Sequence, residues 1–173
     1  IYHERTHQLF FRKNDVTFNE NSAVLLGSMT ALEFVKETYG EDSSEYQTQR
    51  ERIQDRLVFS EFIDELYQEL DQLYSSNLTS ETKIKRREEI FQKHLDKFKT
   101  VKVNLHKSFT NFDQGEINNA YIISLHRYYG KLHVYEKVYE KTSMDLKATV
   151  AFFNQIAQSQ QDPDKVISEF ALD

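Results

Sequence analysis

The chain has 173 residues and no cysteine, so we expect one domain with a sizeable core, and thiol or disulfide chemistry within it is excluded. Its formal net charge of −6 disfavours nucleic-acid binding, which usually requires a basic face. Four glycines and one proline among many Glu, Lys, Gln and Leu residues predict an all-α fold, and no apolar run is long enough to be a transmembrane segment.

The first predicted helix, residues 2–11, begins with the motif His-Glu-x-x-His, in which His3 and His7 flank Glu4. On a helix this spacing places two imidazoles one turn apart on the same face, where both can bind a single zinc ion. The Glu between them can reach the water that the ion activates and act as a general base. We therefore predict His3 and His7 as ligands of Zn²⁺ and Glu4 as catalytic; the alternative for Glu4 is a solvated residue at a helix start.

A second predicted helix, residues 18–39, supplies the third ligand. A catalytic zinc site needs a third protein ligand and an open position for water. Residues 12–15 are polar and turn-forming, so the second helix can fold back and bring Glu20 towards the histidines. Glu33 lies about three and a half turns further along, which is too remote. A set of imidazole and carboxylate ligands without thiolate favours zinc over metals of softer sites.

Two long helices follow, predicted at residues 44–74 and 80–98, and they should form an antiparallel hairpin that turns at residues 75–79. Ser80 is the predicted N-cap of the second of these helices. The basic cluster at residues 83–87 is followed at once by two Glu residues, so we interpret it as a solvated helix face. Helical spacing predicts that four apolar side chains of the second helix face inward: Ile84, Phe91, Leu95 and Phe98.

After a predicted loop at residues 101–115, the pattern indicates four shorter helices, at residues 118–129, 132–141, 146–157 and 164–171. Asp162 and Pro163 suit the start of the last one, with Asp162 as the cap and Pro163 in the first turn. The remaining histidines have no partner at a metal-ligand spacing and are predicted at the surface: His94, His106 and His133.

The two metal motifs resemble those of the gluzincin metallopeptidases, in which Asn-Glu-x-x-Ala follows His-Glu-x-x-His. A narrower resemblance is to the bacterial family described as "putative aminopeptidase". Its His-Glu-x-x-His-Gln, short polar hairpin and Phe-Asn-Glu-x-x-Ala are matched here from His3 to Gln8 and from Phe18 to Ala23. The resemblance continues through residues 73–76, the basic cluster, and residues 118–120, so it spans most of the chain.

This resemblance implies a zinc-dependent aminopeptidase that acts on peptide substrates. It also implies that a Tyr or His stabilises the oxyanion. Tyr128 matches the distal motif of the family and is the first choice, with His126, Tyr121 and Tyr129 as alternatives in the same segment. Four polar residues are further candidates, either for supporting the metal site and binding substrate or for purely structural roles such as helix capping: Gln8, Asn19, Asn118 and Asn119.

Two other classes of function remain open: an endopeptidase or narrow-substrate peptidase with the same zinc chemistry, and a non-catalytic helical interaction module. Members of the family carry a substantial stretch before the metal motif, whereas only two residues precede it here. We therefore expect this chain to be the C-terminal part of a longer protein whose missing N-terminal region packs against Leu9, Phe10 and Phe11. A signal or lipid anchor in that region would place the protein in the bacterial cell envelope or periplasm.

Overall fold

The computed structural model describes residues 1–172, and this part of the chain is built from α-helices and one 3-10 helix, which confirms the all-α prediction. None of the helices described is long and apolar enough to cross a membrane. In chain order the elements are α1 (Tyr2–Leu9), α2 (Val16–Tyr39), α3 (Ser44–Ser75), α4 (Ser80–Lys102), η1 (Phe112–Gln114), α5 (Asn119–Tyr129), α6 (Leu132–Lys141), α7 (Leu146–Gln158) and α8 (Pro163–Leu172).

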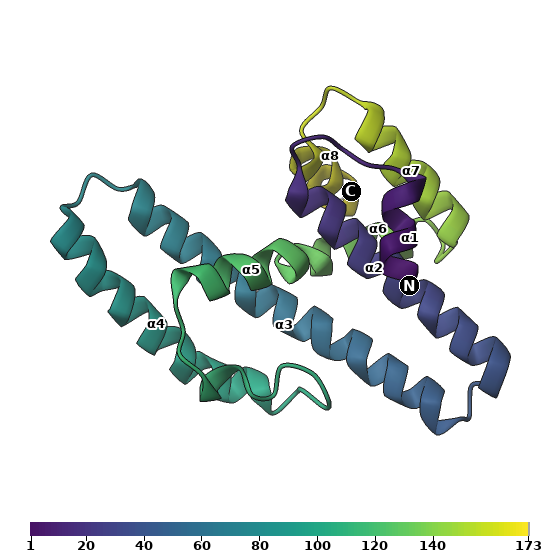
Figure 1. Cartoon of the computed structure of the whole chain (residues 1–173), viewed down its shortest axis with the longest axis horizontal. Helices are drawn as coiled ribbons and strands as arrows, with labels where there is room; N and C mark the ends of the chain where they lie inside the picture. Colours follow the sequence, from purple (N-terminus) through teal and green to yellow (C-terminus); the bar gives the residue numbers. More distant parts are fainter. Residues whose placement is uncertain (173) are drawn as a thin grey trace.

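The long helix α3 connects two groups of helices (Figure 1). The α3–α4 hairpin forms one end, and α5 lies across α3 next to this hairpin. At the other end, α1 packs on α2, α2 packs on α7, and α8 packs on α6 and α7; the two termini are both in this group (Figure 1). The metal motif therefore lies in the part of the fold where the first and the last segments of the chain meet.

Side-chain caps explain where several helices begin. An oxygen of each capping residue accepts a hydrogen bond from a backbone N–H two or three residues later, which satisfies a donor that has no partner within the helix. The caps of α2, α3, α4, α5 and α7 are Asp15, Ser43, Thr79, Asn118 and Asp145. The prediction of Ser80 as the cap of α4 is thus wrong by one residue, whereas Asp162 does accept from the N–H of Asp164 at the start of α8, at 3.0 Å.

A first hydrophobic core joins α2 to the C-terminal helices, and aromatic rings fill its centre. The rings of Phe10 and Phe18 both pack against Phe153 of α7, with centroids 6.1 and 6.2 Å away. The prediction that Phe10 packs outside this chain is therefore wrong: the backbone becomes extended after α1 and turns its ring into this core. Its neighbours Leu9 and Phe11 are exposed.

A second core lies between the α3–α4 hairpin, η1 and α5. Phe59 and Phe62 of α3 contact Phe98 of α4, and Phe112 of η1 closes the cluster with centroids 5.0 Å from Phe98 and 5.3 Å from Phe62. The inward orientation of Ile84 was predicted wrongly, since its side chain is 57% exposed. It lies in the second turn of α4, nearer the tip of the hairpin than Phe91, which belongs to this core.

The prediction that the three isolated histidines lie at the surface is wrong for two of them. His94 is only 1% exposed, and its Nε2 lies 2.8 Å from a carboxylate oxygen of Glu69. His133 is half-buried, with Nδ1 2.8 Å from the hydroxyl of Ser60. His106 is exposed, as predicted. A pattern of apolar residues does not reveal buried histidines that are paired with polar groups of a distant helix.

His106 belongs to a loop that is attached to α3 through a buried carboxylate. Asp55 accepts hydrogen bonds from the backbone N–H groups of His106, Lys107 and Ser108, at 2.6–2.7 Å. Burial opposes ionisation of Asp55, but these donors outweigh it and hold its pKa below the ordinary value. The charged carboxylate thereby fixes the loop after α4 against the middle of α3.

Gly130, between α5 and α6, has no room for a side chain. An added Cβ would lie 2.2 Å from Cδ2 of His126, a buried residue whose Nε2 is 2.9 Å from Asp64 and whose ring stacks on Tyr67 at 3.7 Å. The ring cannot move without losing both contacts. We therefore expect Gly130→Ala to lower the free energy of unfolding by about 1–3 kcal/mol, measured by chemical denaturation.

Gly115 provides the matched control for this prediction. An added Cβ there would meet nothing within 4 Å, and its φ of −109° suits any residue. Gly115→Ala should therefore leave the unfolding midpoint nearly unchanged. If the two variants were equally stable, the packing of His126 against Gly130 would not be as tight as described.

Candidate metal site

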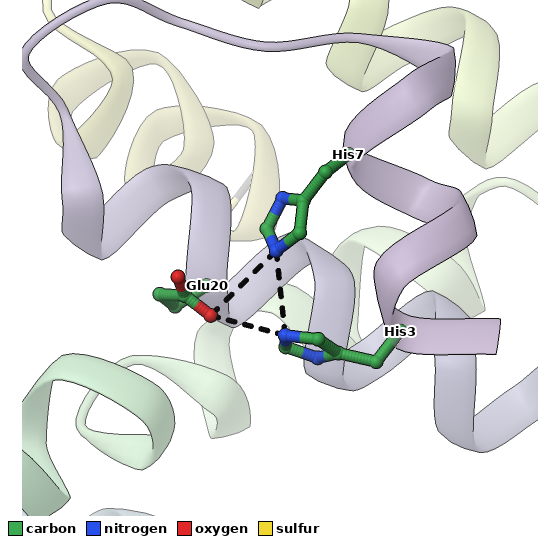
Figure 2. A group of neighbouring side chains, drawn as sticks. All are labelled: His3, His7 and Glu20. Atoms are coloured by element: carbon green, nitrogen blue, oxygen red, sulfur yellow. Dashed lines mark hydrogen bonds and ion pairs between the residues drawn. The ribbon is translucent and has the colours of Figure 1, made fainter. Parts of the chain in front are cut away.

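Three side chains from the two N-terminal helices converge on one point, and Figure 2 shows them facing one another. An oxygen of Glu20, Oε2, lies 3.1 Å from Nε2 of His3 and 3.7 Å from Nε2 of His7, and the two nitrogens are 3.3 Å apart. Donor atoms bound tetrahedrally to one zinc ion lie roughly 3.3 Å from one another. The three observed separations bracket this value, so the residues fit an ion of this size.

The environment of Glu20 is a second test of this fit. Its Oε2 is buried, and the ring nitrogens of His3 and His7 lie close to it, but neither is in hydrogen-bonding geometry and no other residue that the structure describes donates to it. A buried carboxylate oxygen normally has a partner, because leaving it without one is costly. A cation between the three side chains would provide that partner and would also bind the lone pairs of the two imidazoles. Two imidazole nitrogens and one carboxylate oxygen are ligand types that zinc accepts in proteins, so the donor set fits this metal.

The turn between α1 and α2 brings Glu20 back to the histidines. The side chain of Asn19 is buried, donates to the carbonyl of Arg12 at 2.8 Å and accepts from its N–H at 2.9 Å. The guanidinium of Arg12 donates in turn to the carbonyls of Ile156 and Ser159 at the end of α7, and to that of Gln161. Asn19 therefore holds the turn, and Arg12 ties the turn to α7. The sequence identified residue 12 only as part of a polar turn.

Gly27 allows α1 to lie close to α2 at the first ligand. An added Cβ at this position would be 2.9 Å from the backbone nitrogen of His3 and 3.1 Å from its Cα. Any other residue would push the start of α1, and with it the imidazole, away from Glu20. A glycine inside a helix costs helical stability and often indicates such a close approach, so this signal was present in the sequence.

Asn21 connects α2 to α5, a role that was not predicted from the sequence. Its side chain is fully buried, donates to the carbonyl of Arg127 at 3.0 Å and accepts from the N–H of Lys131 at 3.1 Å. These bonds hold the end of α5 against the residue next to Glu20. A buried asparagine needs partners for both its donor and its acceptor, and here the backbone on both sides of Gly130 supplies them.

Tyr128 is the candidate oxyanion residue that lies beside the ligands. Its ring centroid is 6.3 Å from that of His3, and its side chain is partly exposed. The alternatives are engaged elsewhere or lie further away: His126 is paired with Asp64, and the ring of Tyr121 stacks on Phe112. Tyr128 therefore lies in a better position for this role than His126 or Tyr121. Tyr129 lines the same cavity beside His3 and remains an alternative.

The remaining candidates differ in their surroundings. Glu4 and Gln8 are exposed on α1, and their side chains form no hydrogen bond or ion pair with the residues that the structure describes. Asn118 caps α5 by accepting from the N–H of Tyr121. Asn119 donates to the hydroxyl of Tyr74 at 2.8 Å, on the side of α5 that faces the α3–α4 hairpin.

A cavity of about 470 Å³ adjoins His3. Gly27 and Ser28 of α2 form one wall, and Tyr128 and Tyr129 of α5 form another. Gln49 and Arg56 reach it from α3, and no Asp or Glu is among the residues described that line it. The polar side chains that line the cavity therefore carry amide, hydroxyl, imidazole and guanidinium groups.

Comparison with known proteins gives one family. The family described as "Putative aminopeptidase" matches residues 1–167 of the chain, which includes both metal motifs, the hairpin and the segment with Tyr128. No curated protein and no solved structure matches the chain.

Proposed function

We propose, since the chain belongs to the "Putative aminopeptidase" family, that it is a zinc-dependent peptidase that removes residues from the N-terminus of peptides. The convergence of donor atoms of His3, His7 and Glu20 within 4.8 Å of one another is the observation that carries this proposal. These residues would hold zinc, which when bound lowers the pKa of a water molecule and polarises the scissile carbonyl.

Glu4 would move the proton. It neighbours the first ligand in the chain and has an exposed carboxylate without a hydrogen-bond or ion-pair partner in the part of the chain described, so its oxygens are free to accept a proton from the attacking water. The same carboxyl group would then pass the proton to the leaving amine. A carboxylate without other partners is suited to both steps, because neither step requires it to give up a hydrogen bond or an ion pair with another residue.

Tyr128 would stabilise the negative charge that develops on the carbonyl oxygen. Its hydroxyl is a hydrogen-bond donor on a helix whose end is held against α2 through Asn21. A donor positioned before the reaction stabilises the developing charge without a reorganisation cost. The proximity of the ring to His3 supports this role.

A second candidate function is an endopeptidase with the same chemistry. An aminopeptidase must bind the free α-amine of its substrate, which acidic groups do best, and none of the described residues lining the cavity beside His3 is acidic. An endopeptidase needs no such group. The α-amine of an aminopeptidase substrate would therefore bind on the other side of the scissile bond from this cavity.

Blocked and unblocked peptides distinguish these functions. We expect the zinc-loaded protein to cleave a short peptide with a free N-terminus and to leave its N-acetylated form intact, with activity lost on chelation and restored by added zinc. Equal cleavage of the two peptides would favour the endopeptidase. A protein that binds one zinc ion and cleaves neither peptide would contradict both and favour a non-catalytic helical module.

A further inference from the structure

Arg56 is a half-buried cation without an anionic partner. Its Nη1 donates to the hydroxyl of Ser28 at 2.6 Å, and no Asp or Glu in residues 1–172 forms an ion pair with it. Burial lowers its pKa; the neighbouring Tyr129 acts in the opposite direction, and the charge of Arg52, one turn earlier on α3, lowers the pKa again. A guanidinium stays charged in such surroundings, so its burial without a carboxylate is costly. A guanidinium in this state can bind an anion with its remaining N–H donors.

The position of Arg56 connects it to the candidate metal site. It lines the cavity that His3 and Tyr128 border, together with Ser28 and Gln49. A peptide whose scissile carbonyl lies between the metal ligands and the hydroxyl of Tyr128 would extend into this cavity on one side. The absence of acidic groups among the described lining residues disfavours an α-amine there, so the cavity suits the part of the substrate that follows the scissile bond.

We propose that Arg56 binds a carboxylate of the substrate on the leaving-group side of the scissile bond. The planar guanidinium can donate two parallel hydrogen bonds to a carboxylate while Nη1 remains bonded to Ser28. The carboxylate belongs either to the C-terminus of a dipeptide or to an acidic side chain of the residue after the scissile bond. The proposal rests on the proposed function, because it takes His3 as a metal ligand.

Three substrates and three variants test this role. Of the substrates, Ala-Ala carries a carboxylate at its C-terminus and Ala-Glu-amide carries one on a side chain. The third substrate, Ala-Ala-amide, carries no carboxylate. The variants are Arg56→Gln, Arg56→Lys and Arg52→Gln. The last is the control, because it removes the same charge from an exposed residue that does not line this cavity. Thermal unfolding and zinc content of each variant exclude loss of the fold.

We expect Arg56→Gln to lower kcat/KM by about 10- to 100-fold on a substrate with the recognised carboxylate, mainly through KM. Ala-Ala-amide should be cleaved by this variant as by the wild type. Arg56→Lys should lose less than Arg56→Gln, because it keeps the charge but not the planar fork. A loss confined to Ala-Ala identifies the C-terminus of a dipeptide, and a loss confined to Ala-Glu-amide identifies an acidic side chain.

Binding to the zinc-free protein separates this proposal from the proposed function. Chemical-shift titration by NMR should show that the recognised carboxylate ligand perturbs the amides around residues 28 and 56 in the wild type and in Arg52→Gln, but not in Arg56→Gln. If the protein cleaves no peptide and this pattern holds, the peptidase proposal fails and the carboxylate site stands. Equal losses on all three substrates, or binding that is unaffected by Arg56→Gln, would overturn the role of Arg56.

Discussion

Replacing Glu4 with Gln is expected to leave zinc binding near the wild-type level and to lower kcat by about 10²–10⁴-fold, the range typical of losing a general base. The amide keeps the shape and hydrogen-bonding capacity of the side chain but cannot accept the proton. Glu4 is exposed, so the substitution should not affect folding. Zinc content and turnover should be measured on the same sample with a small unblocked peptide.

Glu20→Gln is the matched control, because it makes the same chemical change on the next helix of the same site. A neutral amide is a poor zinc ligand, so this variant should lose metal and activity together. The two carboxylates thus have separate roles that can be measured. Wild-type turnover in Glu4→Gln with zinc bound would show that the proposed mechanism is wrong and would favour the non-catalytic interpretation.

His3→Ala and His7→Ala should each abolish stoichiometric zinc binding, since two remaining ligands hold the ion poorly. The distances support this expectation, because both imidazoles lie within 3.7 Å of the same oxygen of Glu20. Metal content after dialysis against a zinc buffer, measured by elemental analysis, is the direct readout.

His106→Ala is a suitable control for these two variants. It removes an exposed imidazole whose Nδ1 lies 3.1 Å from Asp55, while Asp55 keeps all three backbone N–H donors, from residues 106–108. Zinc content should therefore remain at one ion per chain in this variant. Undiminished zinc in both His3→Ala and His7→Ala would remove the basis for the metal site.

The helices could be predicted from the sequence because helix formation depends on neighbours a few positions apart. The spacing of apolar residues predicted the α3–α4 hairpin, and Asp162 and Pro163 predicted the start of α8. The same reasoning applies to His3 and His7, since residues i and i+4 share a face of any helix. The error of one residue at the cap of α4 reflects competition between adjacent capping residues, and α4 continues past its predicted end at residue 98 to Lys102.

The rest of the site depends on contacts between residues far apart in the chain. The turn that returns Glu20 to the histidines is held by bonds from Arg12 to carbonyls at the end of α7, and the position of Tyr128 depends on Asn21 and the backbone around Gly130. Arg56 lies some fifty residues from the metal motif, and nothing in its local sequence indicates a binding role. Such contacts form only when whole helices pack against one another. Whether a buried polar group then has a hydrogen-bond partner depends on residues far away in the chain, which a local sequence pattern does not reveal.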